Sequence, residues 1–184
     1  MFQSLVYDLK EALKLFRKGD ILQLRGLSNR LIREASVEDN LAKAELGVIA
    51  YALHKLETKN HITNNPKWHK IRKNIFINFE GAIYSINNNQ NEQFFKKLKK
   101  IILDINKIDA DLGNFAQGIY EKSKVKQASL AYSYGLSISK AAEITGADKK
   151  ELQSYIGFTT MHDEENEQKS IKQRVSELKN VLVV

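Results

Sequence analysis

Two residue types that shape many folds are nearly absent from this chain. Its 184 residues include no cysteine and a single proline. Without cysteine, disulfide scaffolds and cysteine-ligated zinc or iron–sulfur sites are excluded. With one proline, few positions forbid an α-helix, so helices are the favoured element.

Long hydrophobic runs are missing as well. No stretch approaches the roughly 18 apolar residues of a membrane span. The first residues, MFQSLVYDLKEALK, carry acidic side chains and amphipathic spacing instead of the charged start, apolar stretch and cleavage site of a secretory signal. We therefore expect a cytoplasmic protein without a membrane partner. Apolar residues make up 42% of the chain, enough to fold around a core.

The usual signatures of catalysis and metal binding are also missing. No two of the four histidines lie three or four residues apart, and there is no HExxH pair. The chain has no phosphate loop, no dinucleotide fingerprint and no G-x-S-x-G nucleophile motif. We expect neither an enzyme nor a bound cofactor or metal.

Apolar residues that are present recur at spacings of three and four, which is typical of amphipathic helices. The segment LGVIAYAL at 46–53 is apolar nearly all round and predicts the most buried helix of a bundle. The predicted stripes are Leu5, Leu9, Ala12, Leu13 and Phe16; Ile21, Leu24, Leu27, Leu31, Ile32 and Ala35; Trp68, Ile71, Ile75, Phe79, Ala82, Ile83 and Ile86; and Phe95, Leu98, Ile102, Ile105, Ile108 and Leu112.

Capping residues and breakers predict where these helices begin and end. Asp20 is placed to cap the second helix, and Ser36 with Asp39 is a loose capping box for the third. Asn65, directly before the single proline, is a strong start for the fourth. The polar run NNNQN at 87–91 predicts the loop before the fifth.

The sequence thus predicts an all-α fold in three parts. Residues 1–122 form a bundle of about five helices, 123–160 a helix-turn-helix, and 161–184 an acidic linker and a C-terminal amphipathic helix. The stripe of that last helix is Ile171, Val175, Leu178 and Leu182. Two placements for it stay open: packing back on the bundle, or pairing with a second copy in a homodimer.

The segment that carries functional information is VKQASLAYSYGLSISKAAEITGADKKELQSYIGFT, starting at Val125. Ser137 is placed to cap a short helix, and Asp148 caps the next one with a capping-box glutamate three residues on. Between them Gly146 makes a tight turn. With Ala142 and Leu152 at the expected spacing from that glycine, residues 125–158 resemble the helix-turn-helix DNA-binding superfamily. The segment departs from that pattern at Thr145 and Ala147, where larger aliphatic residues are usual.

The resemblance implies a recognition helix that begins at Asp148 and enters the major groove of duplex DNA. Gln153 would pair with adenine, and Lys149 and Lys150 would meet phosphates or guanine. The backbone N–H groups at the start of the preceding helix would meet a phosphate. The candidate DNA-binding residues are Ser137, Ser139, Lys140, Asp148, Lys149, Lys150, Gln153 and Ser154.

The charge distribution leaves alternatives open. The net charge is +7, and residues 66–100 hold eight lysines and arginines against two glutamates, whereas 125–160 carries only +1. The basic stretch is either a stripe that faces phosphates or an ordinary solvated helix face. The first hypothesis is a DNA-binding transcriptional regulator. The alternatives are an all-α protein-interaction adaptor with an architectural helix-turn-helix, and an RNA- or ribonucleoprotein-binding helical protein.

Overall fold

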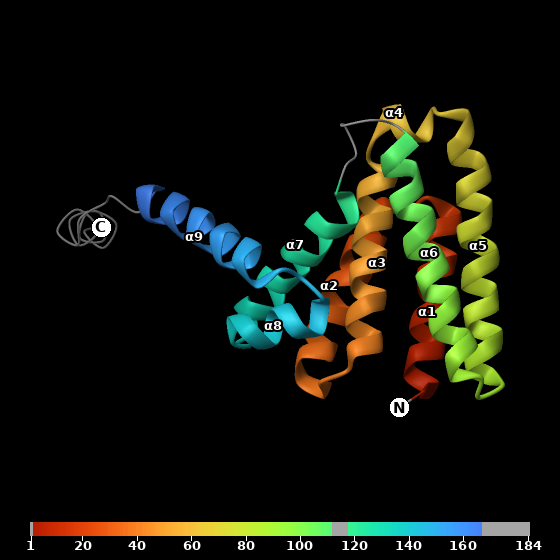
Figure 1. The fold of residues 1–184 in the computed structure, drawn as a ribbon, viewed down its shortest axis with the longest axis horizontal. Helices are drawn as coiled ribbons and strands as arrows, with labels where there is room; N and C mark the ends of the chain where they lie inside the picture. Colours follow the sequence, from red (N-terminus) through yellow and green to blue (C-terminus); the bar gives the residue numbers. More distant parts are fainter. Residues whose placement is uncertain (1, 112–117, 167–184) are drawn as a thin grey trace, which may run out of the picture.

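The computed structural model describes residues 2–111 and 118–166, and in these ranges every regular element is a helix, as predicted. Figure 1 shows their arrangement. The helices are α1 (Phe2–Lys18), α2 (Ile21–Glu38), α3 (Leu41–Glu57), α4 (Asn60–Thr63), α5 (Pro66–Asn87), α6 (Asn91–Asp111), α7 (Ile119–Ser133), α8 (Ile138–Thr145) and α9 (Lys149–Asn166).

Two antiparallel helix pairs, α2 with α3 and α5 with α6, form most of the bundle, and α1 packs between them against α5 and α2. On the opposite side from α5, helix α7 packs along α3 and α2 and carries α8 and α9 (Figure 1). The helix-turn-helix segment is therefore attached to the bundle through α7.

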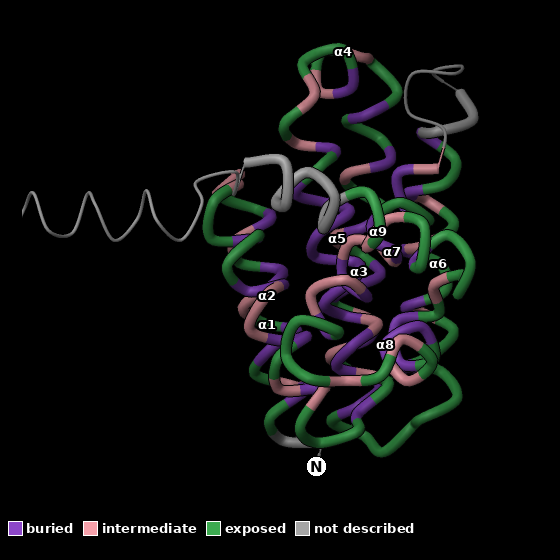
Figure 2. The backbone as a smooth tube through the Cα atoms, turned by 90° about the vertical axis from the view of Figure 1, so that its left-hand side faces the viewer, coloured by how far each residue is buried: buried purple, intermediate pink, exposed green. Residues whose placement is uncertain are grey.

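Helix α3 is the most buried helix, as its all-round apolar middle predicted. Every residue from 46 to 53 is buried there, and Leu46, Ile49 and Leu53 are 0% exposed. The stripe predicted for α1 is buried in full. Those predicted for α2 and α5 are buried apart from Ile21 and Ile83, which are partly exposed. Figure 2 shows the same pattern, with buried residues on the inner sides of the helices and exposed residues outside.

The predicted stripe of α6 was wrong at Phe95 and at Ile102, which is partly exposed, and its last member, Leu112, lies outside the described residues. Phe95 is 44% exposed, and its neighbour Phe94 is completely buried. The buried positions are Phe94, Leu98, Ile101, Ile105 and Ile108, at alternating spacings of four and three. Because the two phenylalanines are adjacent, an apolar stripe with helical spacing can start from either one. Packing against α5 selects the stripe that contains Phe94.

The predicted cap of α3 was also wrong, whereas other caps are present. Asn40, not Ser36, caps α3, because its side chain accepts a hydrogen bond from the Lys43 backbone N–H. Ser36 lies within α2 and donates its hydroxyl to the Ile32 carbonyl at 2.8 Å. Asp20 caps α2, and Asn65 before the proline caps α5, as predicted.

The predicted domain boundaries cut across continuous elements. The boundary at 122/123 falls inside α7, and apolar residues of α7, α8 and α9 belong to the same buried cluster as the bundle. Helix α9 continues to Asn166, past the expected linker start at 161. The predicted C-terminal stripe, which begins at Ile171, lies outside the described residues.

Candidate nucleic-acid interface and a basic pocket beside it

Helices α8 and α9 meet at a glycine corner held by two side-chain caps. Ser137 Oγ accepts a hydrogen bond of 3.2 Å from the Lys140 backbone N–H at the start of α8. Gly146 ends α8 with φ at 66°, in the left-handed region that glycine enters without strain. Asp148 Oδ1 then accepts hydrogen bonds of 2.9 Å from the N–H groups of Lys150 and Glu151. These are the predicted caps and turn.

A small apolar contact region fixes the corner on α7. Ala142 is 6% exposed and Leu152 is 0% exposed, so the small and the large residue of the motif are both buried. Thr145, where a larger aliphatic residue was expected, is buried as well. Its hydroxyl donates to the Ala141 carbonyl at 2.7 Å, which satisfies the polar group inside the helix.

The predicted recognition residues lie on the outside of this corner. The exposed candidates on α9 and its cap are Asp148, Lys149, Lys150, Gln153 and Ser154, and those at the start of α8 are Ser137 and Ser139. The α9 candidates lie in the cap and the first two turns of α9, where Lys150 and Ser154 are on the opposite side of the helix from buried Leu152. The corner is thus available for a partner on its outer face.

Lys140 differs from the other candidates because its charge is already engaged. Its Nζ lies 2.8 Å from Asp39 Oδ1 and 3.1 Å from Glu143 Oε1. Hydrogen bonds to these carboxylates, first Asp39 and then Glu143, raise the pKa of Lys140. The side chain ties α8 to the turn between α2 and α3, a structural role that sequence spacing did not indicate.

The basic stretch at 66–100 lies on α5, the following turn and the first half of α6. Helix α5 is on the far side of the bundle from α9 (Figure 1). Arg72, one of its cations, donates to Glu57 at 2.8 Å and to the Phe16 carbonyl at 2.6 Å. Its guanidinium also lies 4.8 Å from the centroid of the Phe76 ring. Arg72 therefore holds the bundle together instead of facing a ligand.

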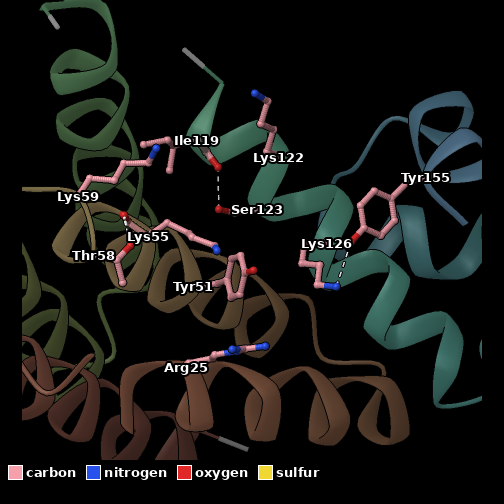
Figure 3. Close-up of a pocket in the computed structure, with 10 residues that line it drawn as sticks. All are labelled: Arg25, Tyr51, Lys55, Thr58, Lys59, Ile119, Lys122, Ser123, Lys126 and Tyr155. Atoms are coloured by element: carbon pink, nitrogen blue, oxygen red, sulfur yellow. Dashed lines mark hydrogen bonds between the residues drawn. The ribbon is translucent and has the colours of Figure 1, made fainter. Parts of the chain in front are cut away.

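A second concentration of positive charge lies beside the corner, in a cavity of about 630 Å³. We call it the basic pocket (Figure 3). It is lined by Arg25 from α2; Tyr51 and Lys55 from α3; Thr58 and Lys59 after α3; Ile119, Lys122, Ser123 and Lys126 from α7; and Tyr155 from α9. Five of these ten residues are cations and none is a carboxylate.

The cations of the basic pocket have few partners. Lys126 Nζ donates to the Tyr155 hydroxyl at 2.9 Å, and Lys55 Nζ lies 5.5 Å from the centroid of the Tyr51 ring. In Figure 3 Lys55 extends along that ring. Within the described ranges, no ion pair engages these two lysines or the other three cations of the pocket.

The positive charge of the pocket affects the pKa of a buried histidine nearby. His54 is 6% exposed, and its Nδ1–H donates to the Ile21 carbonyl at 2.9 Å. Burial lowers the pKa of His54, and the charges of Lys55 and Arg25 lower it further, although the hydrogen bond to Ile21 opposes them. The imidazole is therefore held neutral beside the pocket.

The basic pocket is not evident from the sequence alone, although part of its signal is present there. Lys55 and Lys59 are four residues apart, as are Lys122 and Lys126. This spacing makes the two members of each pair neighbours on the surface of a predicted helix. Acidic residues beside them, Glu57 next to the first pair and Glu121 next to the second, offset these charges along the sequence. Only the fold brings the pairs together with Arg25.

Two further observations on the described part of the chain concern metal binding and membranes. This part contains no group of three or more histidine, aspartate or glutamate side chains that could hold a metal ion. Among its helices, none combines the length and the apolar character that a membrane crossing needs. Comparisons with protein-family models, curated proteins and solved structures find no match to this chain.

Proposed function

We propose that this chain is a DNA-binding protein, a transcriptional regulator that presents the first turns of α9 to the major groove of duplex DNA. The observation that carries the proposal is the exposure of Lys149, Lys150 and Gln153 on the outer side of a glycine-cornered helix pair. No described element covers them. Their exposure leaves them available to a partner, as DNA binding by α9 requires.

Each exposed side chain has a role that its chemistry supports. Lys149 and Lys150 supply positive charge for phosphates at the start of the helix. Gln153, one turn further on, has an amide that donates to N7 and accepts from N6 of adenine. Asp148 and Glu151 lie among them and balance the charges of the two lysines, so the affinity depends on few phosphate contacts.

The test is fluorescence anisotropy with a labelled duplex over a range of salt concentrations. The double variant Lys149→Ala/Lys150→Ala is expected to bind more weakly and to lower the slope of log affinity against log salt by about 2, roughly one for each phosphate that is no longer neutralised. The matched control is Lys70→Ala/Lys73→Ala, which removes two exposed charges from α5. Equal affinity of all three proteins would remove α9 from the contact surface.

A second candidate function, a protein-interaction adaptor, is supported by Phe158. This side chain is 76% exposed on α9, beyond the polar turns. An adaptor would show no affinity for duplex DNA at low salt, and Phe158→Ser would abolish capture of its partner protein while leaving the fold intact. Preference for structured RNA over duplex DNA in direct competition would instead move the proposal to an RNA target.

A further inference from the structure

We propose that the basic pocket binds a small molecule through a chain of two or more phosphate groups, as in a nucleoside polyphosphate. The inference does not depend on DNA binding by α9, because the two sets of residues are different. Its basis is a cavity that collects five cations from α2, α3, α7 and the segment after α3, with no carboxylate in its lining.

The charge arrangement points to an anion with several negative charges. Like charges gathered around one cavity repel each other, and in the described structure no acidic side chain of the lining offsets them. The lowered pKa of the neighbouring His54 has Lys55 and Arg25 among its causes, which reflects the same positive potential. A polyanion relieves this repulsion, whereas a neutral ligand leaves it in place.

The hydrogen-bonding groups of the pocket select an acceptor-rich ligand. The hydroxyl of Thr58 donates to the Lys55 carbonyl at 2.8 Å, and that of Ser123 donates to the Ile119 carbonyl at 2.6 Å. Both protons are therefore used inside the protein, and most of the donors left for a ligand are ammonium and guanidinium groups. Phosphate oxygens are acceptors only, and Arg25 can bind two of them with its planar fork.

The shape of the pocket favours a small molecule over a nucleic-acid backbone. Its volume of about 630 Å³ lies within the range typical of small-molecule sites. Tyr51, Ile119 and Ser123 line it and are buried, so the cavity reaches below those of its cations that are exposed. A small phosphorylated molecule can enter to that depth, whereas the phosphates of a duplex contact exposed groups at the surface.

The test is isothermal titration calorimetry with sodium tripolyphosphate as the probe. The wild-type chain is expected to bind it, and Lys55→Gln/Lys122→Gln is expected to weaken binding by about tenfold or more, because a hydrogen bond to a charged group contributes at least that factor. Both lysines are exposed, so thermal unfolding of the variant checks that the fold is kept. The matched control, Lys70→Gln/Lys73→Gln, is expected to bind as the wild type does.

Failure of the wild-type chain to bind tripolyphosphate would overturn the proposal, as would equal affinity of the pocket variant and the control. A second arm separates the two sources of phosphate. In the Lys149→Ala/Lys150→Ala background, excess duplex DNA is expected to leave tripolyphosphate binding unchanged. Displacement by the duplex would assign the pocket to nucleic-acid phosphates and refute the small-molecule site. Because the background lacks the α9 lysines, the outcome is independent of the DNA-binding proposal.

Discussion

Lys126 on α7 and Tyr155 on α9 join the two helices that flank the basic pocket. The lysine Nζ donates a hydrogen bond of 2.9 Å to the tyrosine hydroxyl and lies 5.3 Å from the ring centroid. Beyond this contact α9 runs away from the body of the molecule (Figure 1). The position of the outer part of α9 therefore depends on a residue of the pocket.

Removing the Tyr155 hydroxyl is expected to loosen α9. Tyr155→Phe keeps the ring over Lys126 and deletes the hydrogen bond, which contributes about 1 kcal/mol. We expect faster amide hydrogen exchange in α9 and a loss of that size in urea-induced unfolding. Tyr134→Phe is the control, because Tyr134 is 44% exposed at the end of α7. Equal exchange rates in both variants would show that the contact does not hold α9.

Two glycine-to-alanine substitutions are expected to change stability in opposite directions. Gly146 has φ at 66°, so an alanine there is strained by about 1 kcal/mol even though its Cβ meets only Lys124 Cε at 3.9 Å. Gly26 lies within α2 without a positive φ, and a Cβ there meets nothing within 4 Å. Gly26→Ala is expected to gain about 0.5–1 kcal/mol. Urea-induced unfolding measures both, and a gain for Gly146→Ala would contradict the left-handed corner.

Features set by neighbouring residues could be predicted from the sequence. The caps Ser137 and Asp148 bond to N–H groups two or three residues on, and Gly146 turns the chain by its own conformation. Their signals are local, so the sequence contains them. The phase of α6 could not be predicted, since Phe94 and Phe95 are adjacent and only the packing partner distinguishes them.

The basic pocket could not be predicted because its parts are far apart in the chain. Arg25, Tyr51 and Lys122 come from three helices, and no local pattern states which helix faces which. The ion pair between Lys140 and Asp39 could not be predicted for the same reason. The turn between α2 and α3 comes close to α8 only in the folded chain. Sequence spacing placed Lys140 among the DNA contacts, and the fold gives it a carboxylate partner.

Arg30 is expected to be more important for stability than its partner Asp8. It donates to Asp8 at 3.0 Å, to Glu11 at 2.7 Å and to Glu34 at 3.1 Å. Burial raises the pKa of Asp8, against the opposing effect of Arg30. Arg30→Met leaves this carboxyl buried and unpaired, at a cost of about 2–3 kcal/mol, less than for a fully buried pair because Arg30 is partly exposed.

Asp8→Asn is the matched comparison for Arg30→Met. It removes the buried charge and keeps an acceptor for Arg30, which retains Glu11 and Glu34. We expect a change in the free energy of unfolding below about 1 kcal/mol at neutral pH. Denaturant unfolding of the two variants measures the difference. Equal losses would show that the network stabilises α1 and α2 through Asp8 itself and not through the pairing of its charge.

Acid is expected to destabilise the protein through His54. The folded state lowers the pKa of this group below its ordinary value of 6.5, so the unfolded chain binds the proton more readily. The stability that neutral His54 contributes is fully present above about pH 6.5 and is lost as the pH falls below it. His54→Asn keeps a donor for the Ile21 carbonyl without a titrating group, and its stability is expected to fall less between about pH 8 and about pH 5.

The effect of the basic pocket on the pKa of His54 can be measured as well. Because the charge of Lys55 lowers the pKa of His54, Lys55→Gln is expected to raise that pKa toward 6.5. Titration of the imidazole ring protons by nuclear magnetic resonance measures the shift directly. His61 and His69 are exposed and serve as internal controls in the same spectra. An unchanged His54 titration would mean that burial alone keeps the ring neutral and that the pocket cations do not act on it.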